Sequence, residues 1–147
     1  MLTFLLFPGQ QSSRLPKPAF MASLSKTATG CTADAAVIFD QVTVNDRQAY
    51  DVRYGSFRAP ITGTYSFSSS LSSIDVFRVN LVLKTVTNVI GYLYEDNPNG
   101  FRHESTSIVT HLTAGDDVWV ACVPGTASNI DGGHGGLHSH FSGFLVD

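Results

Sequence analysis

Three histidines lie in the glycine-rich segment "GGHGGLHSHFSGFLV" (residues 132–146). Imidazole is the commonest metal ligand in proteins and titrates near neutral pH, so this segment is the first candidate for chemistry. His138 and His140 are two residues apart, which on a β-strand places both rings on one face, close enough to share a metal ion. The segment therefore has three interpretations: a metal site, a catalytic site, or a loop that leads into an apolar strand.

The surrounding residues favour the loop. Jelly-roll enzymes of the cupin class follow such a histidine pair with a glutamate, and no glutamate stands between His140 and Asp147. A metal site completed by His134, or by His138 and His140 from neighbouring subunits, stays open as an alternative. Glycine-rich loops lose much conformational entropy when they organise ligands. The chain also has no G-x-S-x-G motif, so we expect no enzymatic activity.

The composition is that of a small β-rich domain. The chain has 147 residues, of which 43% are hydrophobic and only 14% charged, against about 25% charged in an average soluble domain. Nine Lys and Arg residues are scattered along a chain of net charge −3, so no basic patch indicates a nucleic-acid partner.

Residues 19–147 are expected to form the folded domain, and residues 1–18 a leader, a partial signal segment or a linker. The apolar run Leu2 to Phe7 is shorter than a typical signal-peptide core, and no Lys or Arg precedes it. No stretch approaches the length of a membrane span, so we expect no membrane insertion. Cys31 and Cys122 allow one disulfide bond. Cys122 is in phase with apolar neighbours, however, and this pattern favours a buried hydrophobic residue at this position.

Alternation with a period of two dominates after residue 18 and predicts an all-β fold. In "GTYSFSSS", for example, Tyr65 and Phe67 share one face, while serines share the other, which is solvated or interfacial. The expected strands are Phe20–Ser23, Ala36–Phe39, Val42–Val44, Gly55–Arg58, Gly63–Ser70, Asp75–Thr85, Val89–Glu95, Ser107–Thr113, Asp117–Val123 and His140–Val146. Many short strands separated by turn residues indicate a sandwich or barrel.

The spacing of one set of residues resembles the signature of the C1q domain family. The set is Phe39, Asn45, Tyr50, Phe57, Gly63, Tyr65 and Phe67. "AFMAS", "VIFDQVTVN", "GSFRAPITGTYSF", "HLTAGDDVWV" and "FSGFLV" are similar to further segments of the family, in the same order. The chain departs from the pattern at Ser69, where the family usually has another aromatic residue.

The resemblance implies a ten-stranded jelly roll of the C1q and tumour-necrosis-factor type, assembled as a homotrimer and secreted. It further implies lectin-like pattern recognition of microbial surface glycans, such as lipopolysaccharide or mannose-type sugars, in innate immunity. The loops at one end of the sandwich are the expected location of the ligand site. Its candidate residues are Tyr92, Arg102, His103, His134, His138 and His140.

Calcium is a second expectation from the resemblance, because some C1q-domain trimers bind it through carboxylates near the trimer apex. Glu95 and Asp96 are the candidate ligands here, with a solvated turn in "YEDNPNG" as the alternative. No cofactor is expected to be required. The alternative function is that of an extracellular matrix or biomineral-associated calcium-binding structural protein.

Overall fold

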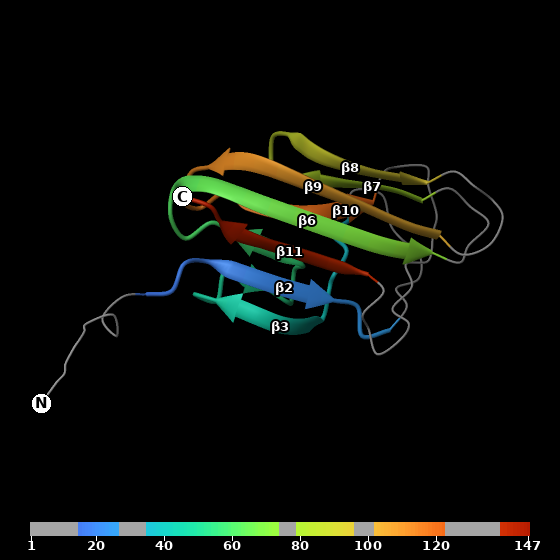
Figure 1. Cartoon of the computed structure of the whole chain (residues 1–147), viewed down its shortest axis with the longest axis horizontal. Helices are drawn as coiled ribbons and strands as arrows, with labels where there is room; N and C mark the ends of the chain where they lie inside the picture. Colours follow the sequence, from blue (N-terminus) through green and yellow to red (C-terminus); the bar gives the residue numbers. More distant parts are fainter. Residues whose placement is uncertain (1–14, 27–34, 74–78, 96–101, 123–138) are drawn as a thin grey trace, which may run out of the picture.

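The computed structural model describes residues 15–26, 35–73, 79–95, 102–122 and 139–147. The regular elements in these ranges are ten β-strands (Figure 1). They are β2 (Ala19–Ser23), β3 (Gln41–Asp46), β4 (Tyr50–Asp51), β5 (Ser56–Arg58), β6 (Gly63–Ser73), β7 (Val79–Lys84), β8 (Val89–Glu95), β9 (Arg102–Leu112), β10 (Asp117–Cys122) and β11 (His140–Leu145). The described ranges contain no helix suited to crossing a membrane.

The strands form two antiparallel five-stranded sheets that face each other. The order in the first, called the front sheet, is β3-β2-β11-β6-β9, and in the second, the back sheet, β4-β5-β10-β7-β8. Figure 1 shows the front sheet nearer the viewer. Neighbours such as β2 and β11 come from opposite ends of the chain, as in a jelly roll. The predicted all-β, ten-stranded jelly roll is therefore confirmed.

An aromatic cluster between the sheets forms the centre of the core. The Phe20 ring stacks on Tyr50 and on Phe57 of the back sheet, each with a centroid distance of 5.1 Å. It meets Phe141 of the front sheet edge to face at 4.8 Å. Such pairs add to the stabilisation that burial of large rings already gives.

Gly143 lets two strands of the front sheet carry large rings side by side. A Cβ atom at this position would lie 2.4 Å from Cδ1 of Phe67. The Phe67 ring therefore occupies the space that a side chain on β11 would need. A glycine inside a strand commonly marks such a close approach.

The main differences between the expected and the observed strands concern three segments. Val37 and Phe39 are buried, but the predicted strand Ala36–Phe39 makes only an isolated bridge, between Ala36 and Ala121. The strand β4 was not predicted, because the turn before it contains no glycine and instead holds Arg47 and Gln48 at φ 64° and 54°. The strand predicted from Ser107 begins at Arg102, since its polar first half pairs with β6.

The outer face of the front sheet carries small polar and apolar side chains. Phe144, Ser66 and Val109 lie in one row across β11, β6 and β9. Phe144 is 52% exposed and Val109 68% exposed. The alternation of "GTYSFSSS" therefore sorts as predicted, with Tyr65 and Phe67 in the core and serines on this outer face.

Candidate functional site

His140 is the first residue of β11 and is only partly exposed. Its Nδ1 atom is buried and has no hydrogen-bond partner among the described residues. Burial lowers the pKa of His140, and the charge of His103 lowers it further. The ring is therefore held in its neutral form to a lower pH than an exposed histidine.

His103 lies on the same outer face of the front sheet, on β9. Its Nδ1 atom is 2.7 Å from Oγ of Ser72, and the backbone N–H of Ser72 donates to Oγ of Ser139 at 2.9 Å. A serine beside a histidine is the start of a nucleophilic site, but such a serine must be reachable by substrate. Ser72 is fully buried, so this pair lacks an accessible nucleophile.

The structure brings together only part of the predicted ligand set. His103 and His140 share the outer face of the front sheet, whereas Tyr92 is exposed on β8 of the back sheet. Arg102 begins β9, and Glu95 ends β8. His134, His138 and Asp96 lie outside the described residues. Within the described ranges, His, Cys, Asp and Glu side chains form no group of three or more that could hold a metal ion.

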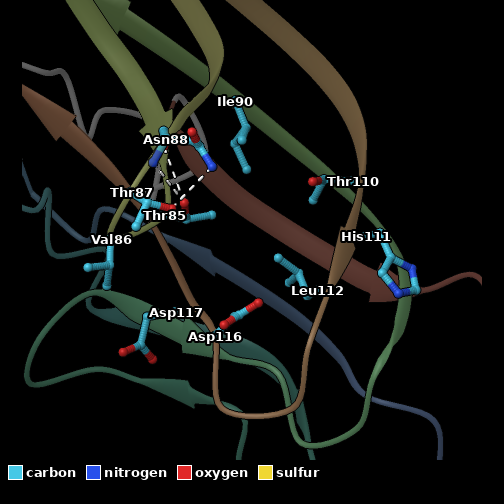
Figure 2. Close-up of a pocket in the computed structure, with 10 residues that line it drawn as sticks. All are labelled: Thr85, Val86, Thr87, Asn88, Ile90, Thr110, His111, Leu112, Asp116 and Asp117. Carbon is cyan, nitrogen blue, oxygen red and sulfur yellow. Dashed lines mark hydrogen bonds between the residues drawn. The ribbon is translucent and has the colours of Figure 1, made fainter.

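A polar pocket of about 180 Å³ opens between the turn that joins β7 to β8 and the ends of β9 and β10. Figure 2 shows the turn residues Thr85, Thr87 and Asn88 joined by hydrogen bonds, with Asp116 and Asp117 below them in this view and the Asp117 carboxylate directed away from the turn. His111 lies apart from the two carboxylates, and Leu112 lies between His111 and these carboxylates in this view. The pocket therefore offers hydroxyl, amide and carboxylate groups rather than an acid–base pair.

The two adjacent aspartates have different roles. Asp116 accepts a hydrogen bond from the backbone N–H of Thr113 at 2.8 Å, which stabilises the turn between β9 and β10. Asp117 accepts two hydrogen bonds from the Arg58 guanidinium, at 2.9 and 3.0 Å, across the β5–β10 pairing.

A larger pocket lies on the other side of Asp117, beside the hairpin of β4 and β5. It measures about 330 Å³ and is lined by Gln48, Asp51, Arg53, Tyr54 and Arg58, among others. None of the site residues predicted from the sequence lies in this pocket. The available signal was "DVRYG" (residues 51–55), where a tyrosine and an arginine stand in a turn and break the alternation.

Cys122 at the end of β10 is buried and disulfide-bonded. Its burial agrees with the sequence prediction, but the preference for an unbonded thiol was wrong. The only other cysteine of the chain, Cys31, lies outside the described residues.

The residues that carry the family resemblance have structural roles. Phe39, Tyr50, Phe57, Tyr65 and Phe67 are all buried in the core. The Asn45 amide brackets the turn into β4, accepting from the N–H of Tyr50 and donating to its carbonyl, both at 2.9 Å. The profile of the C1q domain matches residues 19–146, which is most of the chain. The chain belongs to the C1q domain family.

Relatives of this C1q domain are longer proteins. The collagen alpha-1(X) chain of Mus musculus is 32% identical over 133 residues, covering 90% of this chain and 19% of the relative. The complement C1q tumor necrosis factor-related protein 3 of Mus musculus is 32% identical over 136 residues, covering 87% of this chain and 50% of the relative. The chain therefore spans half or less of the length of these relatives.

Solved structures agree with the fold. The globular domain of the zebrafish complement 1qA protein superposes with a TM-score of 0.74 at 23% identity, covering 89% of this C1q domain and 98% of that chain. The Eiger tumour necrosis factor of S. frugiperda gives a TM-score of 0.67 at 13% identity, covering 90% and 94%. At these identities the likeness concerns the fold.

Proposed function

We propose that this C1q domain is a secreted, non-enzymatic recognition protein that forms a homotrimer and binds microbial surface glycans in innate immunity. Lipopolysaccharide and mannose-type sugars are the expected ligands. The observation that carries the proposal is the polar pocket of Figure 2, whose hydroxyl, amide and carboxylate groups match the alternating donors and acceptors of a sugar.

The homotrimer is supported by the outer face of the front sheet. Phe144 and Val109 expose apolar surface there, beside a row of three serines, Ser142, Ser68 and Ser107, that permits close packing of a second sheet. Exposed apolar patches of this kind mark association surfaces. Three identical weak sites on one trimer would raise avidity for a repetitive glycan surface without any new contact.

Secretion is supported by the disulfide at Cys122. Disulfides persist in oxidising environments such as the extracellular space and are rare in reducing compartments.

A glycan array, run with calcium and with a chelator, tests the proposal. We expect binding to mannose-type or lipopolysaccharide glycans by the wild-type protein. The same array, run with alanine variants, tests the predicted loop residues through the glycan signal of each variant. These residues are Tyr92, Arg102, His103, His134, His138 and His140. Glycan signals that vanish in chelator would support the calcium ligands Glu95 and Asp96.

A matrix function is the second candidate, favoured by the similarity to a collagen chain. It predicts calcium-dependent self-association or mineral binding and no signal on the array. Absence of all glycan binding together with calcium-dependent assembly would replace the recognition proposal with this one.

A further inference from the structure

We propose that the pocket beside the β4–β5 hairpin is a binding site for a neutral hexopyranose, with Tyr54 as its stacking platform. The inference rests on the proposed glycan recognition and adds a second sugar site, separate from the pocket of Figure 2, together with the chemical class of its ligand. The residues that carry it are Gln48, Asp51, Arg53, Tyr54, Arg58 and Asp117, which all line one pocket of about 330 Å³.

Tyr54 supplies an aromatic surface at the rim of the pocket. Its side chain is 64% exposed, and the Arg53 guanidinium lies 5.2 Å from the ring centroid. The guanidinium covers part of one face of the Tyr54 ring and restrains the orientation of the ring. Most of the ring remains exposed to solvent. The C–H face of a sugar ring is apolar and packs well on an aromatic face, so an exposed and restrained tyrosine suits a pyranose.

Two bidentate ion pairs supply planar polar groups. Arg53 donates to both carboxylate oxygens of Asp51, at 3.1 and 2.9 Å. Arg58 donates in the same manner to Asp117, at 2.9 and 3.0 Å. Each guanidinium uses Nε and one terminal nitrogen, which leaves its Nη1 group without a partner among the described residues. Vicinal sugar hydroxyls can bond to such planar groups at two points.

The two ion pairs also determine the net charge of the ligand that fits the pocket. Each arginine in the pocket is matched by one carboxylate, so neither an anionic nor a cationic ligand finds an uncompensated charge there. Hydrogen bonds from Arg53 lower the pKa of Asp51, so this pair stays charged at neutral pH. A neutral ligand with hydroxyl groups fits this alternation of donors and acceptors best.

The backbone around the pocket is held in conformations that cost free energy. Arg47 and Gln48 have positive φ angles although neither is glycine. Gly55, at φ 70°, has no such cost because it lacks a Cβ atom, which would lie 2.6 Å from the Val37 carbonyl oxygen. Strain like that at Arg47 and Gln48 concentrates at binding sites, where it orients side chains. Here it brings Gln48 to the pocket wall, where its amide has no hydrogen-bond partner among the described residues.

A second pocket of about 330 Å³ adjoins the first. The two share Gln48, Asp51 and Arg53, so the Asp51–Arg53 pair stands between them. An oligosaccharide with one sugar unit on Tyr54 can therefore extend past this pair, so that its next unit enters the second pocket. We expect oligosaccharides to bind more tightly than the monosaccharide.

Isothermal titration with methyl α-D-mannopyranoside, methyl β-D-glucopyranoside and methyl β-D-galactopyranoside tests the site in the whole protein. We expect Tyr54→Ala and Gln48→Ala each to weaken binding of the preferred sugar at least tenfold. Tyr54→Phe keeps the ring and should bind within about twofold of wild type, whereas Arg53→Lys keeps the charge but loses the planar fork and should weaken binding. Circular dichroism and the melting temperature of each variant confirm that it folds.

Two further measurements distinguish the alternatives. The affinity should change by less than twofold between 50 and 500 mM NaCl, and N-acetylneuraminic acid should not compete; a steep salt dependence or competition by this acidic sugar would overturn the neutral class. Val89→Ala, at an exposed position on β8 of the same sheet, is the matched control and should leave binding unchanged.

The outcomes separate this inference from the proposed function. Glycan-array signals that survive in Tyr54→Ala and Gln48→Ala, but vanish when Tyr92 is replaced, would overturn the site and keep the lectin function. A wild-type protein that binds no glycan on the array would overturn both.

Discussion

His140 and His103 lie on the same outer face of the front sheet, on the two strands that flank β6. Burial lowers the pKa of His140, and the charge of His103 adds to this effect. The Nδ1 atom of His140 has no partner among the described residues that could stabilise a proton there. Protonation of this ring therefore opposes folding.

We expect the folded protein to lose stability as the pH falls below about 6.5, the ordinary histidine pKa. The folded-state pKa of His140 is lower than its unfolded-state value, so below that pH the unfolded chain binds a proton that the folded chain does not. This loss continues until the pH passes the folded-state pKa. Urea midpoints at pH 7.5 and 5.5 measure it.

His140→Asn removes the titrating ring, so its urea midpoint should fall less between the two pH values than that of wild type. His111→Asn, at an exposed position on the same sheet, is the matched control and should retain the wild-type difference. An identical pH dependence in wild type and His140→Asn would show that other groups cause the acid sensitivity.

Gly143→Ala is expected to destabilise the fold by about 1–3 kcal/mol, the usual cost of overpacking a core. The added Cβ would lie 2.4 Å from Phe67, so this ring, which packs on Phe20 and Phe141, must move. Urea unfolding at pH 7.5 measures the change. Ser142→Ala, one residue away on the opposite face of β11, should change stability by less than about 0.5 kcal/mol.

Phe144→Asp should dissociate the proposed trimer. A carboxylate in this row, with Ser66 and Val109, would be buried without a partner in a packed sheet interface. Sedimentation velocity at micromolar concentration should show the wild type at three chain masses and the variant at one. Val86→Asp is the matched control, because Val86 is 76% exposed in a turn of the back sheet. A wild type that sediments as one chain would refute the trimer and its avidity.

Reduction of the Cys122 disulfide should lower the free energy of unfolding by about 2–5 kcal/mol, the range that is typical of small disulfide-bonded domains. Thermal melts with and without a reductant measure the loss. Alkylation of the denatured, unreduced protein should find no free thiol at Cys122. Full alkylation at this position without reduction would contradict the disulfide.

Much of the fold could be predicted from local patterns. Period-two alternation sorts Tyr65 and Phe67 to the core and the intervening serines to the outer face, because successive side chains of a strand point to opposite sides. The spacing of the aromatic residues indicated the family, because these rings meet in one core. The polar strand start at Arg102 and the two-residue strand β4 were missed, because pairing partners rather than local propensity define them.

The candidate sites depended on tertiary structure. Arg58 and Asp117 are 59 positions apart and meet only because β5 pairs with β10 in one register. The proximity of His103 to Ser72 likewise depends on the pairing of β9 with β6.

The sequence by itself determined the fold class, the family and the composition of the core, because burial of alternate apolar side chains is a local property of each strand. Only the tertiary structure decided that Tyr54, Arg53 and Gln48 line a pocket with Asp117, and that His140 is a half-buried ring without a partner. Strand register across long sequence separations makes those contacts. Local periodicity fixes which side chains face the core, but it does not specify which residues of two distant strands pair.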